Sequence, residues 1–116
     1  MIKEIAEELR KFAAEREWEQ FHTPKNVSMA LSVEASELLE IFQWLTPDES
    51  KRLSSEQYSR VAEEVGDVAN YLIRLCDLLD LDLEECARKK IEINRSKYPA
   101  DRVRGSSKKY TDYNDE

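Results

Sequence analysis

The sequence predicts an all-α, four-helix bundle-like protomer, because its composition, its apolar spacing and its helix-capping residues all favour that class. The chain has 116 residues, of which 41% are hydrophobic and 37% charged, with only two glycines and three prolines. A chain of this length suits a single domain. A fold that contains a sheet needs many tight turns, and turn-forming residues are scarce here. Helices are therefore the expected secondary structure.

Four helical segments are expected, because apolar residues recur at helical spacing. The segments span residues 2–17, 24–45, 56–79 and 83–97. Side chains that favour helix N-caps precede the last three, namely Thr23, Ser54 or Ser55, and Asp82. Thr46 and Pro47 end the second helix and start a short extra turn, and Pro99 ends the fourth helix. We expect a helical domain over residues 1–99 and a polar tail over 100–116.

The composition excludes several kinds of function. With glycine only at Gly66 and Gly105, neither a P-loop nor a dinucleotide-binding fingerprint fits the sequence. His22 is the sole histidine, which excludes a histidine-rich zinc site. The net charge of −7 disfavours non-specific nucleic-acid binding, and no apolar run approaches the ~20 residues of a membrane span. Cys76 and Cys86 are expected to be reduced thiols of a cytoplasmic protein rather than a structural disulfide.

Acidic residues occupy the apolar face of the second predicted helix. At 100° per residue, Leu38 and Ile41 fall within about 40° of Glu34, which places this glutamate in the middle of the expected buried stripe. Glu37 lies at the edge of the same stripe. Glu40 lies outside it, where the acids of a charged helical protein are usually solvated.

The third predicted helix repeats this arrangement. Val68 and Leu75 fall within about 40° of Glu64, and Asp67 lies at the edge of the stripe. Glu63 points outward. Each of two helices therefore carries an acid pair, spaced i and i+3, on the face that should be buried.

Four carboxylates on buried faces need a neutralising partner. Two like charges ~4 Å apart repel by ~4 kcal/mol at an effective dielectric constant near 20, whereas a whole domain is stable by only ~5–15 kcal/mol. Arg60 and Arg74 lie near the third-helix stripe, so a buried salt-bridge network is one solution. A divalent cation is the other, and oxygen ligands favour Mg²⁺ or Mn²⁺ over zinc. The candidate metal ligands are Glu34, Glu37, Glu64 and Asp67.

Characteristic segments accompany the acids. The acid pattern is Glu34-x-x-Glu37 followed by Glu63-Glu64-x-x-Asp67, and the flanking segments are FAAEREWEQFHTPKN (12–26), EASELLEIFQW (34–44) and KIEINRSKYPADRVRGSSKKY (90–110). Over nearly its whole length the chain resembles the MazG-like, all-α nucleoside triphosphate pyrophosphohydrolases, in particular the dCTP pyrophosphatase type. One departure is Glu92, which stands where an aspartate would be expected.

The resemblance implies a Mg²⁺-dependent enzyme that hydrolyses a nucleoside triphosphate of the dCTP kind to the monophosphate and pyrophosphate, and so cleans the nucleotide pool. By this similarity the four acids hold Mg²⁺, and Lys90 and Asn94 contact the phosphates. The residues that would line the base pocket are Trp18, His22, Trp44 and Tyr71. A homodimer or homotetramer is also implied.

Glu37 is the expected general base, because its position at the edge of the stripe leaves room for the attacking water. Two alternatives stay open at this point. The same fold could act on dUTP or another nucleotide. In a non-catalytic helical oligomer, the acids would instead pair with Arg60, Arg74 or another subunit.

Gly66 lies inside the acid pattern of the third helix, where a glycine costs ~1 kcal/mol relative to alanine. A close approach of another helix beside the metal would explain it, and a flexible kink is the alternative.

Overall fold

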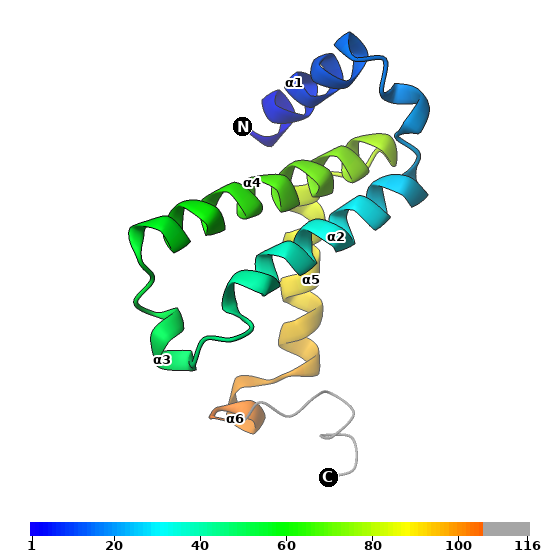
Figure 1. Cartoon of the computed structure of the whole chain (residues 1–116). Helices are drawn as coiled ribbons and strands as arrows, with labels where there is room; N and C mark the ends of the chain where they lie inside the picture. The colour runs from blue at the N-terminus through cyan, green and yellow to red at the C-terminus, as the bar shows by residue number, and fades with distance from the viewer. Residues whose placement is uncertain (106–116) are drawn as a thin grey trace. The chain divides into compact units, whose positions relative to one another are not determined.

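The structure is a computed structural model that describes residues 1–105, and these residues form helices joined by short connections (Figure 1). The elements are α1 (Ile2–Glu15), the 3-10 helix η1 (Glu19–Phe21), α2 (Pro24–Phe42), α3 (Pro47–Ser50), α4 (Ser55–Leu78), α5 (Leu83–Lys97) and α6 (Ala100–Val103). No strand occurs within the described range, which confirms the all-α class. In the same range, every helix is too short or too polar to cross a bilayer.

The chain divides into two compact units, residues 1–81 and residues 82–116. The first unit holds α1, α2 and α4, and the second holds α5 and α6. The four long helices that the sequence predicts are therefore all present. Their assembly into a single bundle, and the division into a domain at 1–99 and a tail at 100–116, stay predictions.

In the first unit, α4 packs against both α2 and α1 (Figure 1). The predicted stripe of α4 is only half-buried, for example at Val68 and Leu75. Ile73 and Cys76 are the buried apolar residues of this helix, and they lie well away from that stripe by helical spacing. Because α4 has two helical neighbours, it buries more than the one face that the periodicity predicts.

Side-chain caps fix the starts of α2 and α4, as predicted. Thr23 Oγ1 accepts a hydrogen bond from the Asn26 amide at 3.2 Å and so caps α2. Ser54, rather than Ser55, caps α4, because its Oγ accepts from the Gln57 amide at 3.1 Å. The Gln57 side chain in turn accepts from the Ser54 amide at 2.9 Å, which completes a capping box.

The end of α2 differs from the prediction, because the helix stops at Phe42 instead of continuing to residue 45. Thr46 is held in an extended conformation (φ −73°, ψ 160°) by the following Pro47, and it caps α3. The chain must leave the helix before it reaches this residue. Trp44 is therefore not on α2, although the predicted helix over residues 24–45 included it, and it is 86% exposed.

A Schellman motif ends α1 and sets the direction of the chain that follows. Glu17 takes a left-handed conformation (φ 55°), and the Trp18 amide donates back to the Ala13 carbonyl at 2.9 Å. The Trp18 ring then meets Phe12 edge to face, with ring centroids 5.8 Å apart. Such an apolar contact back onto the last turn often accompanies this motif, and here it anchors Trp18 beside α1.

The second unit begins with Asp82, whose Oδ1 accepts from the Glu85 amide at 2.9 Å and caps α5 as predicted. The helix carries ion pairs one turn apart, such as Arg88 with Glu84 at 2.8 Å. The start of the predicted polar tail is helical, since α6 spans Ala100–Val103. The rest of that tail, residues 106–116, lies outside the described residues.

Within the described part of the chain, Gly66 has open space where a side chain would lie. A Cβ atom built on this residue would meet no atom within 4 Å among the described residues. The expectation that another helix of the same chain approaches Gly66 closely is therefore wrong.

We predict that Gly66→Ala stabilises the metal-free protein by about 1 kcal/mol, because alanine loses less backbone entropy in a helix and the space beside Gly66 is open. Thermal unfolding followed by circular dichroism should show a rise of a few degrees in Tm. Ala62→Gly, at an exposed position of the same helix, is the mirror-image control and should lower Tm by a similar amount. A lower Tm for Gly66→Ala would instead mean that something packs against this face.

Candidate active site

Three of the four predicted ligands form one carboxylate cluster. Glu34 and Glu37 lie one turn apart on α2, and Glu64 lies on α4, which packs against α2. One carboxylate oxygen from each of the three lies within 4.8 Å of the others. The packing of two helices thus brings together acids that are 27 to 30 positions apart in the sequence.

The carboxylates of this cluster are poorly satisfied by the protein itself. The Oε2 atoms of Glu34 and Glu64 are buried and have no hydrogen-bond partner among the described residues. Hydrogen bonding to Glu37, followed by burial, raises the pKa of Glu34 to about 7, and the charges of Glu37 and Asp67 act in the same direction. Burial is the main cause that raises the pKa of Glu64, and hydrogen bonding to Glu34 opposes it. An unpartnered carboxylate oxygen is costly unless a cation or a proton reaches it.

The arginines near the stripe do not neutralise the cluster. Arg74 pairs with Asp77, at 3.4 Å from Nη1 to Oδ2, and Arg60 forms no ion pair with any described residue. A salt-bridge network around the acids is therefore not found within the described part of one chain. The all-oxygen donor set and the two unpartnered buried oxygens fit a hard divalent cation.

Asp67 lies outside the group of three but beside it. Its charge contributes to the raised pKa of both Glu34 and Glu64. Asp67 also lines a pocket in the first unit, so it belongs to the surroundings of the acid cluster and to the pocket wall. Asp67 therefore lies between the cluster, whose pKa values it influences, and the pocket, which it lines.

The pocket lies between α1 and α4 and has a volume of about 350 Å³. Each of the two helices contributes a ridge of residues spaced i, i+3, i+4 and i+7, and the chain between α1 and α2 contributes two more side chains. The lining residues are Ile5, Glu8, Leu9 and Phe12 from α1, Asp67, Asn70, Tyr71 and Arg74 from α4, and Trp18 and His22.

The pocket brings together three of the four residues that the resemblance assigns to a base site, namely Trp18, His22 and Tyr71. The fourth, Trp44, is not among the residues that line it. Lys90 and Asn94, which the resemblance assigns to phosphate contacts, lie one turn apart on α5 in the second unit and are exposed.

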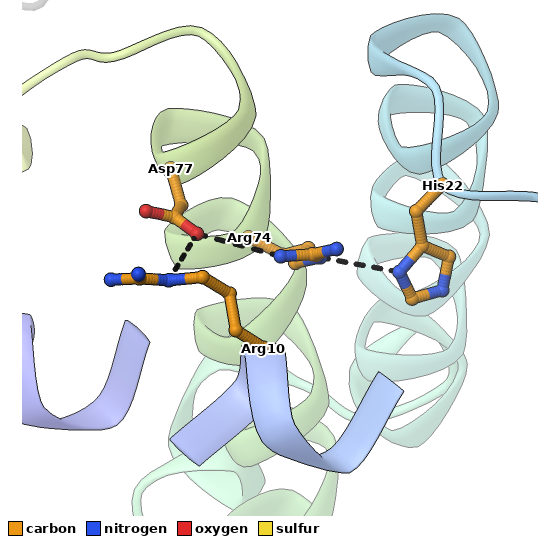
Figure 2. A network of polar contacts seen from close by, with 4 residues as sticks. All are labelled: Arg10, His22, Arg74 and Asp77. Carbon is orange, nitrogen blue, oxygen red and sulfur yellow. Dashed lines mark hydrogen bonds and ion pairs between the residues drawn. The ribbon is translucent and has the colours of Figure 1, made fainter. Parts of the chain in front are cut away.

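Arg10, His22, Arg74 and Asp77 form a polar network (Figure 2), and two of its members, His22 and Arg74, line the pocket. Arg74 is buried, and its Nε donates to Nδ1 of His22 at 3.2 Å. Asp77 accepts from Arg74 and also pairs with Arg10, at 2.9 Å from Nε to Oδ2. Burial, and next the positive charge of Arg74, lower the pKa of His22 below its ordinary value, against a smaller opposite effect of Glu19.

Sequence reasoning missed the roles of Asn70 and Arg74 in the pocket wall. Their spacing from Asp67, at i+3 and i+7, places them on one ridge with Tyr71, and that polar ridge is the signal that could have identified them. The ridge forms a pocket wall only because α1 lies opposite it. This α1 face was predicted simply as an apolar stripe.

The fold and the site define an all-helical protein that gathers carboxylates at a candidate cation site next to a partly aromatic pocket. The chain belongs to the MazG-like family, since a sequence model of that family matches residues 29–113. This agrees with the family resemblance drawn from the acid pattern and its flanking segments.

Relatives and a solved structure cover most of the chain. Human dCTP pyrophosphatase 1 is 45% identical over 103 residues, which are 87% of this chain and 61% of the human protein. The rat dCTP pyrophosphatase 1 is 44% identical over the same shares of the two chains. A pyrophosphatase crystal structure from Archaeoglobus fulgidus has a TM-score of 0.79 and 41% identity, over 84% of this chain and 91% of that one. The chain thus spans about three fifths of the length of the two mammalian relatives.

We predict that the metal-free protein loses stability as the pH rises from about 4.5 through about 7. These two values are the ordinary and the raised pKa of Glu34. Between them, the folded state keeps a proton on Glu34 that the unfolded state has already released at lower pH. The loss should be on the order of 1 kcal/mol, since water screens these carboxyl groups. Urea unfolding in the presence of a chelator measures it.

Glu34→Gln should remove most of this pH dependence, whereas Glu40→Gln, at an exposed position of the same helix, should leave it unchanged. A stability that rises over this pH range in the wild-type protein would contradict the raised pKa of Glu34.

Proposed function

We propose that this chain is a Mg²⁺-dependent nucleoside triphosphate pyrophosphohydrolase that acts on dCTP or a similar nucleotide. The observation that carries the proposal is the carboxylate cluster near a pocket of about 350 Å³, with Asp67 lining the pocket and influencing the pKa values of the cluster. The identity to dCTP pyrophosphatase 1 and to the archaeal pyrophosphatase supports the reaction and the substrate class. Water would cleave the bond between the α- and β-phosphates, releasing the monophosphate and pyrophosphate.

The acid cluster has the donor chemistry of a Mg²⁺ site, and Mn²⁺ has similar preferences. Glu34, Glu37, Glu64 and Asp67 would hold the ion, which supplies the positive charge that draws a polyanionic triphosphate to an acidic surface and polarises the α-phosphate. The two buried oxygens without hydrogen bonds, on Glu34 and Glu64, are the strongest support for these two ligands.

Glu37 is the proposed general base. Neither of its oxygens is among the buried atoms without a partner, so this carboxylate is not required wholly for the cation. Hydrogen bonding to Glu37 is the main cause of the raised pKa of Glu34, which supports a position for Glu37 directly beside the other proposed ligands. In the proposed reaction Glu37 takes the proton of the attacking water, which typically contributes 10²–10⁴-fold to the rate.

The pocket would bind the nucleobase. Its volume of about 350 Å³ lies within the range of small-molecule sites, ~300–1,000 Å³. Trp18 and Tyr71 offer ring surfaces, and stacking on such rings suits any base. Preference for one base therefore needs polar groups as well, and those in the wall are His22, Asn70 and Arg74.

Lys90, Asn94 and Trp44 are proposed substrate contacts that do not line the pocket. On α5, Lys89 pairs with Glu85, whereas Lys90 forms no ion pair with any described residue. Lys90 would offset charge on the leaving pyrophosphate, with Asn94 contacting the phosphates one turn away. Trp44, exposed beyond the end of α2, would reach a base across a subunit boundary, which fits a homodimer or homotetramer. We place this activity in the cytoplasm, where it would clean the nucleotide pool.

We predict that the purified protein with Mg²⁺ releases pyrophosphate from deoxynucleoside triphosphates, and from dCTP most efficiently. A panel of dCTP, dUTP, dTTP, dATP, dGTP and CTP, assayed for pyrophosphate, measures this. Glu37→Gln should lower kcat by about 100-fold or more, whereas Glu40→Gln should not change it. The proposal fails if no nucleotide of the panel yields pyrophosphate, and a preference for dUTP would revise the substrate alone.

We also predict that Mg²⁺ raises the Tm of the wild-type protein, because a ligand at 100 times its Kd stabilises by about 2.7 kcal/mol. Glu64→Gln should raise the Tm of the metal-free protein, since it relieves repulsion, and should abolish most of the response to Mg²⁺. The control is Glu63→Gln, which changes the exposed neighbour. If Glu64→Gln lowers the metal-free Tm and Mg²⁺ does not stabilise the wild type, the acids serve a structural network instead.

A further inference from the structure

Arg74 is a buried cation whose partners are unusual. Its side chain is 8% exposed, and it lies in the wall of the pocket instead of neutralising the acid cluster. Nη1 faces the carboxylate of Asp77 at 3.4 Å, and Nε donates to Nδ1 of His22 at 3.2 Å (Figure 2). One guanidinium therefore joins an acid on its own helix to the imidazole that precedes α2.

The direction of the Arg74–His22 hydrogen bond determines the tautomer of the imidazole. An arginine side chain can only donate, so Nδ1 of His22 must be the acceptor and must carry no proton. The proton of the neutral ring is then on Nε2. Protonating Nδ1 would set an N–H against the Nε–H of Arg74 and would place two cations in contact, and Glu19 offers only a smaller opposing effect.

His22 and Arg74 both line the pocket, and Nε2 is the ring nitrogen that this hydrogen bond leaves available to a ligand. A neutral imidazole has no charge with which to attract a phosphate, whereas its N–H suits a carbonyl oxygen or an unprotonated ring nitrogen of a base. The neighbouring aromatic side chains, Trp18 and Tyr71, are also suited to a base.

We propose that Arg74 is a positioning residue that holds His22 as the Nε2–H tautomer, so that His22 donates a hydrogen bond to an acceptor atom of the bound nucleobase. This rests on the proposed function for the identity of the ligand, but the tautomer itself does not. Because stacking alone suits every base, His22 and Arg74 would supply part of the selectivity of the pocket.

The chain offers a matched control for Arg74. Arg10 pairs with Asp77, the same carboxylate that Arg74 contacts, at 2.9 Å from Nε to Oδ2. Arg10 does not line the pocket and has no hydrogen bond to His22 among the described contacts. Arg10→Gln therefore disturbs the ion pairs on Asp77 and leaves the Arg74–His22 contact in place, whereas Arg74→Met removes that contact.

The tautomer can be measured directly, because His22 is the only histidine in the chain. In the full chain labelled with ¹⁵N-histidine, NMR should show a proton on Nε2 and none on Nδ1 at neutral pH. Arg10→Gln should give the same spectrum. Arg74→Met should give a mixture of tautomers and a higher pKa for His22. A wild-type protein with the proton on Nδ1 would overturn the proposal, even if Arg74→Met does not fold.

The contact to the base is tested with dCMP as the probe. Adding dCMP and Mg²⁺ should shift the Nε2–H signal of the wild-type protein, and an unchanged signal in a protein that binds dCMP would overturn the proposal. With dCTP, Arg74→Met should raise KM about tenfold, the equivalent of one hydrogen bond, and should leave kcat within about twofold. Arg10→Gln should change neither constant.

These outcomes separate the inference from the proposed function. If no nucleotide yields pyrophosphate, the proposed function fails, while the tautomer in the free protein is still measured. If dCTP is hydrolysed and Arg74→Met lowers kcat with KM unchanged, Arg74 acts in the chemical step and the positioning role is wrong.

Discussion

The packing of α4 against α2 forces like charges together, and the rest of the site depends on this constraint. Glu34 and Glu64 approach because each lies on the face that its helix turns toward the other. Within residues 1–105, no arginine relieves the repulsion, and one oxygen of each carboxylate is buried without a hydrogen bond. A helix pair that served stability alone would place apolar side chains at these positions. The arrangement is understandable if these carboxylates bind a cation from solution.

The pocket forms because α4 also packs against α1. Because α4 contacts both helices, it contributes to both features. Its Glu64 joins the acid cluster beside α2, and its ridge from Asp67 to Arg74 lines the pocket beside α1. One helix therefore fixes the distance between the place that would hold phosphates and the place that would hold a base. Such rigid spacing is what a reaction at a defined phosphorus atom requires.

The sequence predicted what depends on local spacing and missed what depends on packing. The four long helices, their caps at Thr23, Ser54 and Asp82, and the presence of acids on the two stripes were accessible from periodicity and capping preferences. The early end of α2, which removes Trp44 from the helix, depends on how a short connection reaches the Thr46 cap. The pocket could not be predicted, because each of its two ridges looks ordinary until the other helix lies opposite. The direction of the bond between Arg74 and His22 joins residues 52 positions apart, and no pattern in the sequence encodes it.

The Schellman motif at the end of α1 places a non-glycine residue, Glu17, in the left-handed region directly before Trp18. A side chain in that conformation costs up to about 1 kcal/mol relative to glycine. Glycine at this position would therefore relieve the strain in the turn. It would also increase the conformational freedom of the unfolded chain, and of the turn that directs Trp18 into the pocket wall. A small backbone strain at Glu17 thus accompanies a turn that restricts the motion of Trp18 in the pocket wall. A substitution at Glu17 would therefore exchange backbone strain for freedom of motion in the pocket wall.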